Sequence, residues 1–333
     1  MSDAEIREAG APFDAPDADI ILRSADGVHF KFHKQYLTRA LYGFEHILGT
    51  GELNGIGAAE ERQNGLTVIP LPESTPVLDL FLRVLFPVEL GCPVIGDHLG
   101  HMPGVCKALS KYCVRNMPAG VRDGLLLASV QKPELVYAIT CPYDSLSNVT
   151  KVAAKHTLRD ARRLDDLPAE VVAEISGLQY HALTQYQIAC RTAAIAACDF
   201  RKIRCFANET PGLSPTEDDP PKQCNCYTYH HTVVLRRFYG PPDDSDFNEE
   251  TCELPGWLVE YCNDVAGEIR TGRKICGNVA LNDKPLATAI RACKSCPACG
   301  TDVGTFFRFA HFLAEWIDQD ISEVELESNT LAS

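Results

Sequence analysis

The cysteines offer the clearest chemistry in this sequence, because eleven of the fifteen lie within residues 190–299. The run Cys-Lys-Ser-Cys-Pro-Ala-Cys at residues 293–299 contains two overlapping Cys-x-x-Cys spacings. In a zinc knuckle, a tight turn of this kind lets two thiolates bind one tetrahedral ion. A second pair of ligands is needed, and a Cys-x-Cys step just before two histidines at 230–231 offers it. We therefore predict a structural zinc site formed by Cys224, Cys226, Cys296 and Cys299.

Two other uses of these thiols stay open. Cys226 and Cys296 lie much farther apart than the ligands of a compact zinc finger, so the thiols would also fit a core as small hydrophobic groups. A redox or disulfide role is the third alternative, since Cys299 lies just before a predicted helix start that would lower its pKa. A zinc- or thiol-dependent activity in the C-terminal half would need an open metal position or such a thiol. We expect no other cofactor.

The overall charge argues against several function classes. The chain has 333 residues with 31 basic and 45 acidic side chains, which gives a net charge of −14. An acidic chain is not expected to bind nucleic acid generally, although short basic runs occur at 201–204 and 236–237. No apolar run approaches the roughly 18 residues of a membrane-spanning helix, so we expect no membrane association. The acidic arm at residues 1–13, predicted to be disordered, has no export signal, which favours an intracellular protein, cytoplasmic and/or nuclear.

Catalytic motifs are missing from the sequence. It contains no His-Glu-x-x-His, no Gly-x-Ser-x-Gly, no Walker loop and no dinucleotide fingerprint. We therefore expect a protein that is not an enzyme.

The first hundred residues predict a small sheet followed by helices. An apolar run at 19–23 and an alternating run at 28–32 flank Asp26-Gly27, which is a strong hairpin signal. Helical spacing begins at Lys34, a glycine-rich loop is expected over 49–65, and another strand over 66–71. Thr75 is predicted to cap a helix over 76–86 that is apolar almost all round, with Asp79 and Arg83 on its polar stripe. Such a helix belongs in a core or an interface.

The rest of the chain reads as mainly helical. We predict a connector over 87–104 and a linker over 208–223, whose composition recurs over 240–251. The predicted helices lie at 105–112, 133–141, 148–161, 168–176, 179–198, 257–269 and 303–317. The last two are expected to be the final long helices, and an apolar stripe marks the second of them.

The opening of the chain resembles that of BTB/POZ domains. The resemblance rests on Asp19-Ile-Ile-Leu, then Asp26-Gly27, then Phe-Lys-Phe-His33-Lys34-x-x-Leu, and it covers residues 14–117. With the Cys-rich helical tail, the chain is similar to the BTB-domain proteins that fungi carry in many copies. The resemblance implies an α+β fold in which a small sheet is capped by helices. From the helical spacing described above, we expect a mainly helical region at 118–207 to follow it. A linker with the Cys/His cluster at 208–250 and a Cys-rich helical region with an acidic tail at 251–333 would follow.

The resemblance also implies roles for particular residues. Asp19 matches the family's pocket aspartate, His33-Lys34 its His-Lys/Arg step, and Phe44 its aromatic position, whereas the family's serine after the first long helix is absent. The family pattern implies that Asp19 and Lys34 approach each other near a dimer surface. The other interpretation is that Asp19 is a solvated residue at a strand start and Lys34 a surface lysine. His33 is expected to be a packed structural histidine.

The family's usual activity is protein–protein association. The resemblance therefore implies a non-catalytic protein that associates with itself or with other proteins through its N-terminal domain, with a homo-oligomer expected. A substrate adaptor for a cullin-type ubiquitin ligase is the alternative that the family suggests.

Overall fold

The computed structural model describes residues 7–40, 62–114, 117–199, 232–238, 247–253, 256–296 and 303–326. The fold is α+β, as the sequence predicted, with a small sheet and many helices. The chain forms two compact units. We call them the N-terminal unit (7–156 and 167–179) and the C-terminal unit (157–166 and 180–326).

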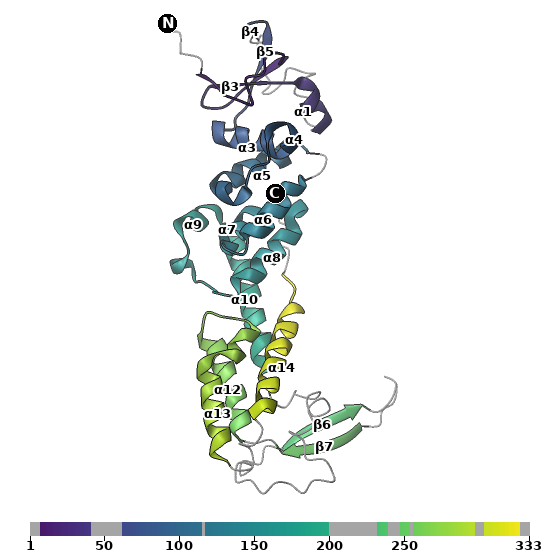
Figure 1. Cartoon of the computed structure of the whole chain (residues 1–333), viewed down its shortest axis with the longest axis vertical. Coiled ribbons are helices and arrows are strands. Elements are labelled where there is room, and N and C mark those ends of the chain that lie inside the picture. The colour runs from purple at the N-terminus through teal and green to yellow at the C-terminus, as the bar shows by residue number, and fades with distance from the viewer. Residues whose placement is uncertain are drawn as a thin grey trace. The chain divides into compact units, whose positions relative to one another are not determined.

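A five-stranded sheet opens the N-terminal unit (Figure 1). Its strands lie in the order β1-β3-β2-β5-β4, and their bounds are β1 (Arg7–Glu8), β2 (Ile20–Arg23), β3 (Val28–Phe32), β4 (Arg62–Gln63) and β5 (Leu66–Pro70). The central strand β2 pairs antiparallel with β3 and parallel with β5. Both edge strands are only two residues long, which limits the unpaired backbone that the sheet presents. Because β1 pairs with β3 and Phe13 is buried, the disorder predicted over residues 1–13 is wrong for residues 7–13.

The predicted hairpin between β2 and β3 is confirmed. Gly27 has a φ of +82°, a conformation that glycine adopts at no steric cost, and the hydroxyl of Ser24 accepts the N–H of Val28 at 3.0 Å. The alternation along β3 places Phe30 and Phe32 in the core, where they pair in register with β2. The turn residues and the alternating pattern therefore specify the same register.

A second hairpin was not predicted. Asn64 and Gly65 both have positive φ, +51° and +85°, which is the signature of a tight turn between antiparallel strands. This turn joins β4 to β5, so the loop predicted over 49–65 is wrong at its end, where Arg62 and Gln63 form a strand. The rest of that loop, residues 49–61, lies outside the described residues.

Helices make up most of the N-terminal unit (Figure 1). They are α1 (Lys34–Ala40), α3 (Thr75–Leu85), α4 (Pro87–Leu90), η1 (Ile95–His101), α5 (Met102–Lys111), α6 (Ala119–Ala128), α7 (Pro133–Thr140), η2 (Asp144–Leu146), α8 (Ser147–Thr157), α9 (Ala169–Glu174) and the first residues of α10 (Gly177–Ala197). The helices predicted between residues 105 and 198 are confirmed, with ends that differ by a few residues. The helical spacing predicted from Lys34 onward is confirmed for residues 34–40, and its continuation lies outside the described residues.

The apolar helix α3 lies in the core of this unit. It packs against α5 and η1, and its buried residues are Leu78, Leu80, Phe81, Leu82 and Val84. Its predicted polar pair is present, since Arg83 donates to Asp79 at 2.9 and 3.2 Å. Neighbouring elements of the same unit cover most sides of this helix, so its apolar side chains are buried in a core, one of the two predicted locations.

The predicted connector over 87–104 is wrong. Those residues form α4, η1 and the first turn of α5, and α6 was not predicted. Ile95 and Leu99 of η1 are buried, and η1 packs against α5 and α6. Pro87 and Pro103 lie in the first turns of α4 and α5, and Gly91 directly follows the last residue of α4.

The C-terminal unit is mainly helical. Besides most of α10, it contains η3 (Leu164–Asp166), α12 (Gly256–Thr271), η6 (Gly277–Leu281), α13 (Asp283–Ser295), α14 (Val303–Ser322) and the antiparallel strands β6 (Thr232–Phe238) and β7 (Phe247–Glu253). Because β7 begins at Phe247, the linker-like composition noted over 240–251 extends into a strand. The linker predicted over 208–223 lies outside the described residues.

Aromatic rings form the centre of the C-terminal unit. Phe306 of α14 meets Trp257 and Tyr261 of α12 edge to face, with ring centroids 5.5 and 5.0 Å apart. The apolar stripe predicted on α14 is confirmed, since all of its members are buried except the half-buried Trp316.

Helix α13 lies between the two helices predicted to be the last long ones, and was missed. Its buried residues are Pro285, Ala289 and Cys293, which recur every four positions but are small. Among the described helices, none combines the length and the apolar character that a bilayer crossing requires.

Candidate functional site

The predicted interaction residues lie where the first hairpin leads into α1. Asp19 Oδ1 accepts the main-chain N–H of Lys34 at 2.7 Å, so Asp19 caps the N-terminus of α1. Both side chains are exposed. The structure therefore brings Asp19 and Lys34 together through the main chain of Lys34, and the contact positions a helix.

His33 is half-buried. Its ring packs edge to face on Tyr36, with centroids 5.6 Å apart, and its Nε2 lies 3.7 Å from a carboxylate oxygen of Asp17. These are packing and polar contacts of a structural histidine. The remaining predicted interaction residue, Phe44, lies outside the described residues.

A second carboxylate of the hairpin holds the start of α3. Asp26 Oδ1 accepts both the N–H and the hydroxyl of Thr75, each at 2.8 Å. These bonds favour the charged form, and the Thr75 hydroxyl contributes most to lowering the pKa of Asp26 to about 2. The prediction that the Thr75 hydroxyl caps its own helix is wrong: Ser74 is the N-cap residue, and Asp26 supplies the side-chain acceptor.

An apolar groove lies on the helical part of the N-terminal unit. Its volume is about 270 Å³, and it is lined by Val84, Leu85, Pro87, Cys92, Pro93, Ile95, Pro118, Ala119 and Gly120. These residues come from the end of α3, the start of α4, the segment leading into η1 and the start of α6. A lining without a charged side chain favours an apolar occupant over a polar substrate.

Two contacts fix the walls of this groove. Arg83, already paired with Asp79, donates through Nη1 to the carbonyl of Leu90 at 2.6 Å and thereby holds the end of α4. On the other wall, α6 approaches η1 so closely that a Cβ on Gly124 would lie 2.5 Å from Ile95 Cγ1. Only glycine permits that approach without a shift of the neighbouring side chain.

Apolar side chains protrude beside the groove. Val88, which follows the lining residue Pro87, is 90% exposed, and Val94, between Pro93 and Ile95, is 66% exposed. Exposed branched apolar side chains next to an apolar hollow extend it into a contiguous apolar patch, and such patches often mark interaction surfaces. We call Val88, Val94 and the lining residues the apolar surface.

The apolar surface was not predicted from the sequence, although a signal for part of it exists. The buried residues Ile95, Leu99, Met102, Cys106 and Leu109 recur every three or four positions from the predicted connector into the helix predicted over 105–112. That periodicity indicates a continuous helical stretch despite its glycines and proline.

Most of the described cysteines are buried. Burial raises the pKa of Cys106 and of Cys198 to about 12, and also raises that of Cys262. These thiols are therefore protonated at neutral pH and pack as small hydrophobic groups, one of the alternatives considered for them.

The zinc site stays a prediction. Cys296 is buried at the end of α13, whereas Cys224, Cys226 and Cys299 lie outside the described residues. Within the part of the chain that is described, no three His, Cys, Asp or Glu side chains converge as metal ligands would.

Comparison of the chain with protein-family models, curated proteins and solved structures finds no significant match.

Proposed function

We propose that this chain is a non-catalytic interaction protein that pairs with a second copy of itself through a BTB/POZ-like N-terminal unit. The order of a hairpin, a helix capped by Asp19, a parallel strand and a buried apolar helix supports the family resemblance. The observation that carries the proposal is the apolar surface, with its 90% exposed Val88.

A second copy suits this surface because the surface has both of the shapes that a symmetric interface needs. In a two-fold interface the same patch meets itself, so a hollow must lie beside a projection that fits it. The groove is the hollow, and Val88 and Val94 next to it are the projections. Each copy would place its valines in or against the groove of the other.

Salt concentration separates this mode of association from an electrostatic one. Two copies that each carry a net charge of −14 repel each other. Salt screens that repulsion at separations beyond the Debye length, which is about 8 Å at physiological ionic strength, and leaves apolar contacts intact. Self-association should therefore strengthen as sodium chloride is raised, whereas a dimer held by ion pairs would weaken.

Light scattering coupled to size-exclusion chromatography of the full chain tests the proposal. At tens of micromolar, roughly ten times the dissociation constant of a weak interface, a dimer is expected. The double substitution Val88→Asp with Val94→Asp should yield a monomer, because it would bury carboxylates at the interface.

A matched control changes two other exposed valines of the same unit, Val130 and Val172, to aspartate. This control should remain dimeric. A strict monomer for the unaltered chain contradicts the proposal, as does a dimer that only the control substitutions disrupt.

A further inference from the structure

Charged side chains of the C-terminal unit surround an open pocket of about 500 Å³. The pocket is formed by the segment after α8, the end of α12 with the turn that follows it, and η6 with the start of α13. Its charged lining residues are Arg159, Asp160, Glu268, Arg273, Lys274 and Lys284. Four cations thus face two carboxylates, which is a local positive excess in a chain whose net charge is −14.

Main-chain hydrogen bonds hold two walls of the pocket together. The N–H of Ala161 donates to the carbonyl of Arg273 at 2.9 Å, and the N–H of Ile275 donates to the carbonyl of Leu158 at 2.7 Å. The segment that carries Arg159 is thereby fixed beside the one that carries Lys274. The convergence of these cations therefore depends on backbone pairing as well as on long side chains.

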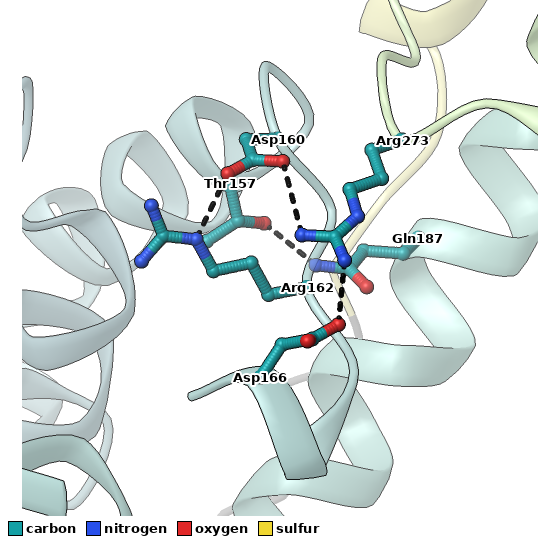
Figure 2. Close-up of polar contacts among 6 residues, drawn as sticks. All are labelled: Thr157, Asp160, Arg162, Asp166, Gln187 and Arg273. Atoms are coloured by element: carbon teal, nitrogen blue, oxygen red, sulfur yellow. Dashed lines mark hydrogen bonds and ion pairs between the residues drawn. The ribbon is translucent and has the colours of Figure 1, made fainter. Parts of the chain in front are cut away.

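Figure 2 shows how one pocket carboxylate is neutralised. Asp160 lies between two guanidinium groups, 2.9 Å from Nε of Arg162 and 4.0 Å from Nη1 of Arg273. Arg273 also donates to Asp166 at 2.8 Å, and Gln187 of α10 donates to the hydroxyl of Thr157 at 3.0 Å. Arg273 is therefore held in one orientation by acids on the facing segment.

The other pocket carboxylate, Glu268, also has partners within the protein. Glu268 accepts from the side-chain amide of Asn282 at 3.0 Å and lies 3.7 Å from the ammonium of Lys284. The end of α12 is fixed by Arg191 of α10, whose guanidinium donates to the carbonyls of Ile269 and of Gly272, the latter at 2.8 Å. Both carboxylates of the pocket, Asp160 and Glu268, are thus paired with side chains of the pocket itself or of its neighbouring segments.

Two cations of the pocket remain without such a partner. Among the residues that the structure describes, neither Arg159 nor Lys274 forms an ion pair with a carboxylate. They come from different segments that the backbone pairing holds side by side. Their charges are available to an anion that spans both.

We propose that this pocket binds a small molecule that carries phosphate groups. Guanidinium and ammonium donors are the side chains that bind phosphate oxygens most strongly, and two of them match the charge of a phosphate dianion. The volume falls in the range of small-molecule sites. Val279 is the lining residue with an apolar side chain, so the site recognises the ligand chiefly through charge.

Calorimetric titration of the full chain with inorganic pyrophosphate tests the proposal, with sodium chloride added to keep the ionic strength constant. Pyrophosphate should bind with a dissociation constant below about 1 mM. Replacing Arg159 and Lys274 together by alanine should weaken binding about a hundredfold, or roughly tenfold per charge-assisted contact. Both side chains are exposed, so the variant should retain its circular dichroism spectrum.

The control removes the same two charges from an exposed part of α13, with Arg291→Ala and Lys294→Ala. Its affinity for pyrophosphate should stay within about twofold of that of the unaltered chain. No binding by the unaltered chain overturns the proposal, and so does an equal loss in both variants, since that would reflect net charge alone. Citrate serves as a carboxylate probe, and citrate binding as tight as that of pyrophosphate overturns the assignment to phosphate.

Discussion

The apolar surface of the N-terminal unit and the charged pocket of the C-terminal unit differ in composition and in origin. The first is built from residues 84–120, a short stretch of neighbouring helices, and it has no charged lining. The second gathers six charged side chains from segments more than a hundred positions apart. The two proposals therefore ascribe two kinds of recognition to one chain, one by removal of apolar surface from water and the other by charge.

The cores that support these two surfaces differ as well. In the N-terminal unit, which also contains the sheet, α3 packs against other helices. The ring of Phe81 in α3 packs on that of Tyr112, with centroids 5.6 Å apart. In the C-terminal unit the helices pack on one another around Phe306. If each unit has its own core, damage to one core should leave the other unit largely intact.

The largest expected effect tests that independence directly. Phe81→Ala and Phe306→Ala each remove a side chain that is 1% exposed, and each should destabilise its unit by about 3–5 kcal/mol. Hydrogen exchange followed by mass spectrometry should show lost protection in the N-terminal unit for the first variant and in the C-terminal unit for the second. Loss of protection across both units from either substitution would show that they unfold together.

A substitution of intermediate effect concerns the C-terminal unit alone. A Cβ on Gly277 would lie 1.9 Å from the main-chain oxygen of Ala314, so Gly277→Ala must push η6 away from α14. We expect a loss of about 2–3 kcal/mol in urea unfolding.

The matched control for that substitution is Gly267→Ala within α12. A Cβ there meets nothing within 4 Å, and alanine favours the helix, so a gain of about 0.5–1 kcal/mol is expected. If both substitutions destabilise alike, the close contact of η6 with α14 is not the cause.

The smallest expected effect is an acid dependence confined to the N-terminal unit. The folded pKa of Asp26 is about 2, below its ordinary value of 3.8, so its contribution is fully present above that value and is lost as the pH falls toward 2. Asp26→Asn should lower the urea midpoint at pH 7 and flatten its decline between pH 4 and pH 2. The exposed Asp97, changed to asparagine, serves as control and should leave that decline unchanged.

Local patterns in the sequence predicted the elements whose signals are strong. Asp26-Gly27 between alternating runs specified the β2–β3 hairpin, and the aromatic stripe around Phe306 specified α14. Prediction failed where a helix buries small residues, as α13 does with Ala289 and Cys293, or where glycines and prolines interrupt the pattern, as they do before α5. In such segments tertiary packing supplies what the local signal lacks.

The candidate sites were less accessible to sequence reasoning. The approach of Asp19 to Lys34 followed from the family resemblance, but that the contact is made to the main chain of Lys34 could not be read from residue types. Arg159 and Lys274 have no sequence relationship that would bring them together. They line one pocket because residues 158–161 pair with residues 273–275, which is a property of the folded chain alone.

The parallel pairing of β2 with β5 has a consequence for synthesis on the ribosome. β3 can pair with β2 soon after both have emerged, but the other side of β2 meets its partner only when Thr67 and Ile69 have been made. Until then a strand containing Ile20, Ile21 and Leu22 has an open edge, which can pair with other chains. Formation of the β2–β3 hairpin therefore does not protect the nascent N-terminal unit from aggregation, and we expect it to need chaperones until β5 has been made.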